Sequence, residues 1–153
     1  MSIYTLHREQ VIKTSIDEAW SFFSSPYNLS KITPIYMNFQ ITNNPKSSIY
    51  EGMKIDYLVS PIGKIHMQWI TEIIEVEKPF CFVDIQTKGP YKLWKHKHTF
   101  VQNGENVIVK DVVKYELPLG ILGNFAHLAF VKQRLNKIFD YRENVLKTIF
   151  KTK

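Results

Sequence analysis

The chain has 153 residues, of which 44% are hydrophobic and 14% aromatic, and this is enough for one domain with a sizeable core. We therefore treat residues 1–153 as a single domain. Lysine and arginine number 20 against 14 acidic residues, which gives a net charge of +6. The positive charge is spread along the chain, and even its densest group, Lys92, Lys95 and Lys97, is not the tight arginine cluster of a dedicated nucleic-acid binder. We expect a solvated basic face and no nucleic-acid partner.

The N-terminal segment and the cysteine content exclude further classes. The first residues include His7, Arg8 and Glu9 and lack the apolar core of a signal peptide, and no apolar run approaches the roughly 20 residues of a membrane span. We therefore expect a cytoplasmic protein without stable membrane insertion. Cys81 is the only cysteine, which excludes an internal disulfide. Its aromatic neighbours indicate a buried thiol without a chemical role.

The first third of the chain predicts a strand followed by two short helices. Residues 3–13 are rich in β-branched and aromatic types and predict the strand. Ser15 and Glu18 then form a capping box, and the apolar positions 16, 19, 20 and 23 predict a helix that ends before Pro26. A second short helix is expected over 27–32, closed by Pro34.

From residue 35 the hydrophobic period changes to two, which predicts antiparallel strands with one buried face. The expected buried positions are Ile35, Met37, Phe39 and Ile41 in one strand, and Met53, Ile55, Tyr57 and Val59 in the next. Turn residues at 43–45, 61–63, 78–79, 88–90 and 103–104 separate roughly six strands after the helices.

After residues 117–120 the sequence is helical to its end. The apolar stripe of this helix consists of Phe125, Leu128, Val131, Leu135, Ile138, Val145 and Ile149. A helix of about 30 residues is about 45 Å long. Because that is longer than a strand, we expect the helix to lie diagonally across the concave face of the sheet.

Residues 91–100 place large aromatic and imidazole groups on one side of a strand. One face carries Lys92, Trp94, His96, His98 and Phe100, and the other carries Tyr91, Leu93, Lys95, Lys97 and Thr99. The Asn103-Gly104 pair predicts a hairpin. A two-residue turn there sets His96 opposite Asp111, and a four-residue turn sets His98 opposite Asp111. In both registers Asp111 shares a face with the two histidines.

Asp111 lies on an otherwise apolar strand face, where an unpaired carboxylate is costly. Arg142 takes the next place in the helical stripe and could reach inward to pair with Asp111 or with a bound anion. Two interpretations stay open. His96, Asp111 and Arg142 satisfy one another as a buried network that fixes the helix on the sheet, or they form the polar end of a ligand pocket.

Metal binding is the weaker hypothesis. His96 and His98 could share an ion, but a third ligand is needed, and only His66 and His127 remain as candidates. We therefore expect no metal and no cofactor. The sequence also lacks a Gly-x-Ser-x-Gly elbow and a phosphate-binding glycine loop, which disfavours a serine hydrolase and nucleotide chemistry.

The sequence does not settle the role of Trp69 or the direction in which Asp84 faces. Trp69 shares a face with Met67, Thr71 and Ile73 and is either pocket wall or ordinary core. The face occupied by Asp84 and its neighbours cannot be assigned, because a one-residue change in the turn at 88–90 reverses it.

Several segments together carry a family resemblance. They are Ala19-Trp20-Ser21-Phe22-Phe23, Asn28-Leu29, Thr33-Pro34, Gly52-Met53-Lys54-Ile55-Asp56-Tyr57, Trp69, Phe82-Val83-Asp84, Gly89-Pro90-Tyr91, Trp94-x-His96-x-His98-x-Phe100, Asp111, Tyr115-Glu116-Leu117-Pro118 and Arg142. Over essentially the whole chain the sequence resembles the START and pollen-allergen-like SRPBCC superfamily, in particular its bacterial cyclase/dehydrase-like branch. The stretch from Gly89 to Phe100 is the most specific part of this match.

The resemblance implies an α+β helix-grip fold. In this fold a seven-stranded curved antiparallel sheet wraps around a long C-terminal helix, two short helices lie between strands 1 and 2, and a ligand cavity lies between sheet and helix. Superfamily members bind lipids, sterols, polyketides or plant hormones, and a minority catalyse cyclisation or hydrolysis. The fold by itself therefore leaves the function open.

Our first hypothesis is a noncatalytic carrier or sensor of a small hydrophobic or amphipathic molecule. The residues assigned to the ligand are Tyr57, Trp69, Trp94, His96, His98, Phe100, Asp111 and Arg142. The alternative is a polyketide cyclase-like or aromatase-like enzyme in which His96 and Asp111 act as a general base. A third hypothesis, a module that binds a partner through its basic face, requires a cavity filled by side chains.

Overall fold

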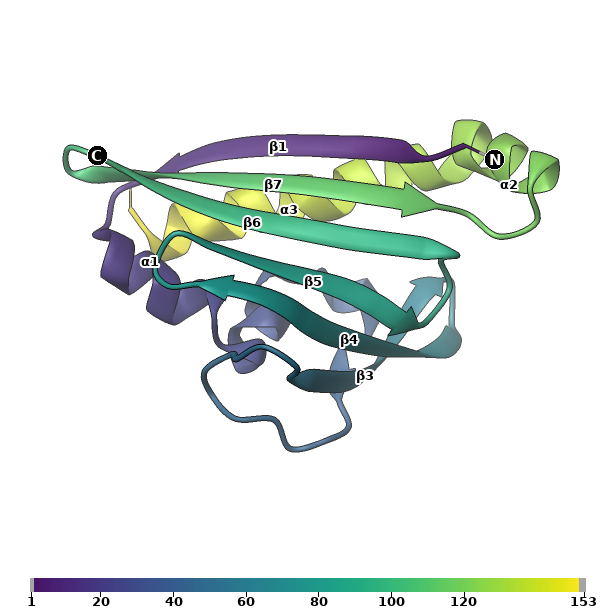
Figure 1. Cartoon of the computed structure of the whole chain (residues 1–153). Coiled ribbons are helices and arrows are strands. Elements are labelled where there is room, and N and C mark those ends of the chain that lie inside the picture. The colour runs from purple at the N-terminus through teal and green to yellow at the C-terminus, as the bar shows by residue number, and fades with distance from the viewer. Residues whose placement is uncertain (1, 152–153) are drawn as a thin grey trace.

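One antiparallel sheet forms the frame of the protein, and helices cover its concave side in the computed structural model, which describes residues 2–151 (Figure 1). Its strands are β1 (Tyr4–Ile12), β2 (Gln40–Ile41), β3 (Lys54–Ile62), β4 (Ile65–Glu77), β5 (Cys81–Lys88), β6 (Leu93–Asn103) and β7 (Asn106–Glu116). The seven strands are hydrogen-bonded in the order β1-β7-β6-β5-β4-β3-β2. The predicted seven-stranded sheet is confirmed.

Three short helices follow β1: α1 (Ile16–Phe23), η1 (Pro26–Ile32) and η2 (Ile35–Met37). Half of the predicted capping box is present: the Ser15 hydroxyl accepts a hydrogen bond of 3.2 Å from the Glu18 backbone N–H, whereas the Glu18 carboxylate accepts from the Thr14 hydroxyl at 2.6 Å. The strand predicted from Ile35 is wrong. Residues 35–37 form a 3-10 turn after Pro34, and Asn38 ends it in the left-handed conformation with a φ of 48°. Only the two residues Gln40 and Ile41 pair with β3.

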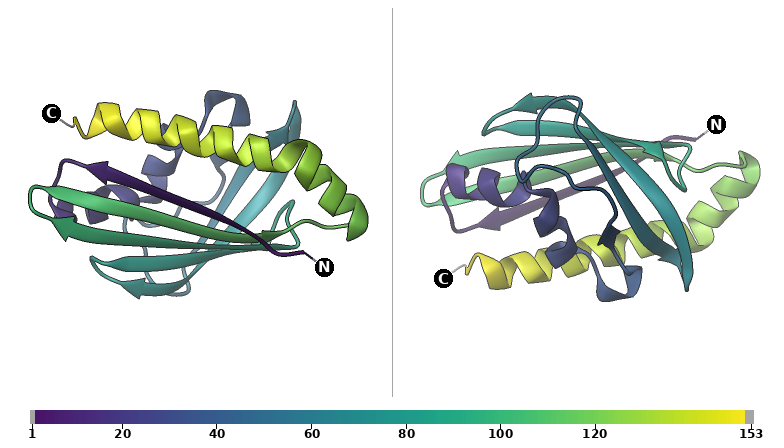
Figure 2. Two further views of the ribbon diagram at one scale, coloured as in Figure 1. Left: turned by 90° about the horizontal axis from the view of Figure 1, so that it is seen from above. Right: turned by 90° about the horizontal axis from the view of Figure 1, so that it is seen from below.

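The C-terminal helical segment lies along the concave side of the sheet and consists of α2 (Ile121–Ala126), η3 (His127–Val131) and α3 (Lys132–Ile149) (Figure 2). Its predicted apolar stripe is only partly correct. Phe125 and Ile149 are exposed, whereas Phe139 and Leu146 are buried. Within α3 the buried residues are Leu135, Phe139, Arg142 and Leu146, so the stripe advances by four, three and four residues where the prediction took three, four and three. The side chain of Leu128 lies outside the described part of the chain. Among the described residues no helix has the length and apolar character of a membrane span.

The hairpin between β6 and β7 sets the register of the candidate site. Asn103 pairs with Asn106 and His98 pairs with Asp111. The turn therefore consists of Gly104, with a φ of +62°, and Glu105, not of Asn103 and Gly104. The predicted register that places His96 opposite Asp111 is wrong. The predicted register that places His98 opposite Asp111 is found, although the turn that produces it has two residues and not four. Asp111 shares a face of the sheet with both histidines, as predicted for either register.

The solid part of the core lies under α1. Trp20 packs edge to face against Phe82 and Phe100, with ring centroids 5.8 and 6.0 Å apart. Cys81 is buried nearby, and burial raises the pKa of its thiol, in line with an unreactive role. Because α1 packs directly on this end of the sheet, open space is left only further along the concave face.

Candidate functional site

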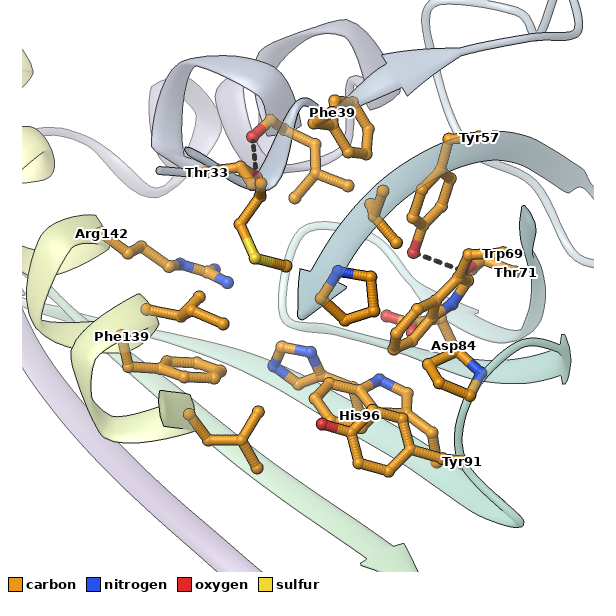
Figure 3. Close-up of a pocket in the computed structure, with 18 of the residues that line it drawn as sticks. Thr33, Phe39, Tyr57, Trp69, Thr71, Asp84, Tyr91, His96, Phe139 and Arg142 are labelled. Carbon is orange, nitrogen blue, oxygen red and sulfur yellow. Dashed lines mark hydrogen bonds between the residues drawn. The ribbon is translucent and has the colours of Figure 1, made fainter. Parts of the chain in front are cut away.

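A cavity of about 470 Å³ lies between the concave face of the sheet, the C-terminal helical segment and the helices after β1 (Figure 3). Most of the side chains that line it are apolar. They include Phe23, Leu29, Ile32, Met37, Phe39, Val59, Ile73, Leu135, Ile138 and Phe139. The volume is within the range of sites that bind small organic molecules. The cavity is therefore not filled by side chains, which counts against the hypothesis that requires a solid interior.

Aromatic rings from three strands form one wall of the cavity. Tyr57 stacks on Trp69 with ring centroids 5.9 Å apart, and Trp94 meets Trp69 edge to face at 5.3 Å. The Tyr57 hydroxyl lies 3.1 Å from Thr71 Oγ1, and burial raises the pKa of Tyr57. Trp69 Nε1 is buried and has no hydrogen-bond partner among the described residues. A ligand oxygen at this wall would satisfy that donor.

Tyr91 also belongs to the wall, although the predicted alternation placed it on the opposite face. β6 begins at Leu93, so the period of two does not extend back to Tyr91. The Gln86 side chain instead fixes this residue by accepting from its backbone N–H at 3.1 Å and donating to its carbonyl at 2.7 Å. The Gly89-Pro90 turn before Tyr91 was the signal that strand alternation should not be extended there.

Phe100, which the sequence assigned to the ligand, is not part of the cavity wall. Its exposed fraction is 1%, and its ring packs against Trp20 and Phe23. It faces the concave side as predicted, but α1 covers the end of β6 where it lies. Phe100 therefore belongs to the packed core beside the cavity.

Asp111 is the centre of a buried polar cluster, which we define as Asp84, His96, His98, Asp111 and Arg142. Its Oδ1 atom lies 2.8 Å from His96 Nε2, 3.4 Å from His98 Nδ1 and 3.4 Å from an Arg142 guanidinium nitrogen. Asp111 itself is not in the wall of the main cavity, whereas the other four residues are. The Asp111 carboxylate therefore lies on the side of the histidines that faces away from the cavity, where it contacts both rings.

Asp84 completes the cluster and was the residue whose facing the sequence left open. Its Oδ2 atom accepts a hydrogen bond of 2.7 Å from His98 Nε2. Asp84 faces the cavity because it pairs with His96 across β5 and β6. Two register shifts between β4 and β5 separate this strand from the hydrophobic pattern of β4. The pattern alone could therefore not assign its face.

The two histidines have opposite protonation preferences although their rings stack 3.7 Å apart. Burial and the neighbouring His98 lower the pKa of His96. For His98, burial is outweighed by its interactions with Asp111 and Asp84, which raise its pKa. Burial is likewise outweighed at Asp111, where the Arg142 charge, the hydrogen bond with His96 and the nearby His98 lower the pKa. These shifts favour a proton on His98 and the neutral form of His96.

His96 is the member of the cluster best placed to act on a ligand. A carboxylate only accepts hydrogen bonds, so the Nε2 atom beside Asp111 carries the proton and Nδ1 is left with a lone pair. Nδ1 has no partner among the described residues, and the imidazole lines the cavity (Figure 3). The arrangement can accept a hydrogen bond from a ligand or, with a suitable substrate, remove a proton.

A metal ion has one possible set of ligands in this cluster. Donor atoms of Asp84, His96 and His98 all lie within 4.8 Å of one another. The third ligand is thus Asp84, not His66 or His127, which bond to Ser60 and Tyr115. His98 Nε2 lies 2.7 Å from Asp84 Oδ2, so a metal held by all three residues would replace this hydrogen bond.

The comparisons with known proteins rest on structure alone, because no protein-family model and no curated protein matches the sequence. The major latex-like protein 151 from Panax ginseng is 15% identical, with a TM-score of 0.71 over 98% of this chain and 99% of that chain. Norcoclaurine synthase from Thalictrum flavum, solved in complex with dopamine and hydroxybenzaldehyde, is 16% identical, with a TM-score of 0.66 over 99% and 90%.

A third solved structure, the protein Ms6760 from Mycobacterium smegmatis, is 13% identical and has a TM-score of 0.66 over 95% of this chain and 92% of that chain. At such identities a likeness establishes the fold and leaves the activity open. The chain therefore has the same helix-grip fold as these three proteins.

Proposed function

We propose that this protein binds a small, mainly apolar molecule in the cavity and carries or senses it without changing it chemically. The observation that carries the proposal is the cavity of about 470 Å³, whose wall is mostly apolar and has a polar cluster on one side. Such a combination selects amphipathic ligands, because the apolar wall supplies most of the binding free energy and a few polar groups fix the orientation.

One fold neighbour supports the binding of a small molecule, although as a synthase it does not distinguish a carrier from an enzyme. Norcoclaurine synthase of Thalictrum flavum holds two small aromatic compounds, dopamine and hydroxybenzaldehyde, in its solved complex. The aromatic wall formed by Tyr57, Trp69, Tyr91 and Trp94 would suit a ligand with a ring or a flat hydrocarbon skeleton. A hydroxyl group on that ligand could donate to His96 Nδ1.

A fluorescent apolar probe tests the proposal directly. N-phenyl-1-naphthylamine should bind with one-to-one stoichiometry and increase in fluorescence as it leaves water. Val59→Phe adds bulk to the cavity wall and should weaken this binding, whereas Val101→Phe makes the same change at a position that is 40% exposed and should have no effect. Equal binding by both variants would show that the probe sits elsewhere, and the proposal would fail.

The second candidate function is an enzyme that uses His96 and Asp111 as a general base. The bond of 2.8 Å between His96 Nε2 and Asp111 favours it, because Asp111 orients the ring and leaves Nδ1 free toward the cavity. The assay is deuterium exchange from D2O into an enolisable ring ketone such as 2-tetralone, followed by NMR. His96→Gln should abolish catalysed exchange while the apolar probe still binds. Exchange no faster than in buffer with the unmodified protein would count against this function.

A further inference from the structure

We infer that the ligand of this cavity is an anion, and that Arg134 binds its acidic group. The inference rests on the proposed function and specifies the chemical class of the ligand: an apolar skeleton that carries a carboxylate, sulfonate or similar group. Arg134 lies in α3 and lines the cavity. The sequence pattern did not single it out.

The charges around the cavity leave Arg134 without an anionic partner. The ionisable side chains that line the cavity are Asp84, His96, His98, Arg134 and Arg142, together with tyrosines, and Asp111 lies directly behind the histidines. His98 pairs with Asp84 at 2.7 Å, and Arg142 pairs with Asp111 at 3.4 Å. Among residues 2–151 no carboxylate forms an ion pair with Arg134. Arg134 therefore lies at an apolar cavity without a carboxylate partner.

The immediate surroundings of Arg134 are aromatic. Its guanidinium lies 5.3 Å from the ring centroid of Tyr36 and 5.7 Å from that of Phe130, and these two rings are 48% and 44% exposed. The group is therefore at the edge of the cavity, where the wall meets solvent. Ring faces hold a cation in place without neutralising it. The positive charge thus remains available to an anion.

Arg134 also has an unsatisfied hydrogen-bond donor. Its Nε atom is buried and has no acceptor among the described residues. A buried donor without a partner costs free energy that a ligand oxygen would recover. A carboxylate or sulfonate can accept from a guanidinium at two positions, which makes an anionic group the best-matched acceptor. The net charge of +6 adds a long-range attraction for anions.

The geometry therefore points to a ligand with two ends. The anionic group would lie at the rim beside Arg134, and the apolar skeleton would fill the space lined by the aromatic wall. A neutral hydrocarbon of the same shape would leave both the Arg134 charge and the Nε donor without a partner. Selectivity for the anion over its neutral analogue is the property that this arrangement predicts.

Two probes with the same ring skeleton test the inference. They are 8-anilino-1-naphthalenesulfonate, which is anionic, and N-phenyl-1-naphthylamine, which lacks the sulfonate. Arg134→Gln should weaken binding of the sulfonate by about tenfold to a hundredfold and change binding of the neutral probe by less than about twofold. Arg134→Lys keeps the charge and should retain part of the sulfonate affinity. Lys137→Gln removes an exposed charge from the same helix and serves as the control.

The outcomes separate this inference from the proposed function. Failure of the neutral probe to bind the unmodified protein would overturn the proposed function, and the inference would fall with it. Binding of the neutral probe together with equal loss of both probes in Arg134→Gln, or no loss of either, would overturn the inference alone. Thermal unfolding of each variant shows whether a loss of binding reflects unfolding, and Arg134→Lys supplies the comparison if Arg134→Gln does not fold.

Discussion

The buried polar cluster allows a sharp prediction about stability, because one carboxylate oxygen serves three partners. Asp111→Asn removes the charge that faces His96, His98 and Arg142 while it keeps the shape of the side chain. His98 still has Asp84, but Arg142 becomes a buried cation without a counterion. Breaking such a pair from one side costs about 3–5 kcal/mol. For a chain of this size that lowers the melting temperature by roughly 6–20 °C.

A matched variant shows whether burial is the reason. Asp140→Asn makes the same change in the Arg8–Asp140 pair, whose atoms are closer, at 2.7 Å, but whose carboxylate side chain is 61% exposed compared with 9% for Asp111. An exposed pair of this kind contributes about 0–1 kcal/mol. The two variants are compared by urea unfolding followed by circular dichroism. A cost for Asp140→Asn that equals or exceeds that for Asp111→Asn would refute the reasoning.

Three further predictions follow from the site and the core. NMR titration of the histidine ring protons should find His98 protonated above its ordinary pKa of 6.5 and His96 neutral below it, and the reverse order would contradict the assigned charges. The stabilisation from the His98 proton is therefore present below about pH 6.5 and lost as the pH rises through the raised pKa, whereas that from Asp111 is lost as the pH falls through its lowered pKa. Phe100→Leu should destabilise the fold by about 1–3 kcal/mol and leave the affinity for N-phenyl-1-naphthylamine unchanged, whereas Trp94→Leu should weaken binding; a binding loss in Phe100→Leu would return that residue to the wall. Ser15→Ala should cost about 1 kcal/mol in urea unfolding because the Glu18 N–H loses its cap, and an unchanged midpoint would show that the cap contributes nothing.

Much of the sheet could be predicted because a strand repeats every two residues. Met53, Ile55, Tyr57 and Val59 are all buried as the alternation requires. The shared face of His96, His98 and Asp111 was predictable for the same reason. A change of two residues in the turn moves each residue opposite a different partner but leaves every side chain on the same face of the sheet. The exact register was not predictable, because a turn at Gly104 and Glu105 differs from one at Asn103 and Gly104 by a single step along the chain.

The remaining errors concern the C-terminal helical segment and the residues Asp84 and Tyr91. In the C-terminal helical segment the sequence spacing took Ile138 instead of Phe139 as the inward residue after Leu135, and it placed the exposed Phe125 inward. Bulges between β4 and β5 hide the facing of Asp84. Tyr91 lies before the strand to which its alternation was attributed. At Asp84 and Tyr91 the hydrophobic pattern failed because it does not continue across a bulge or past the end of a strand.

The central claim is that the cavity between the sheet and α3 holds an organic molecule in the native protein. Native mass spectrometry of protein isolated from its own cells, without denaturing steps, tests it most directly. We predict an added organic mass of one molecule per chain, which is absent from the Val59→Phe variant and present in Val101→Phe. Protein that carries no added mass and that also fails to bind the apolar naphthylamine probe would contradict the claim.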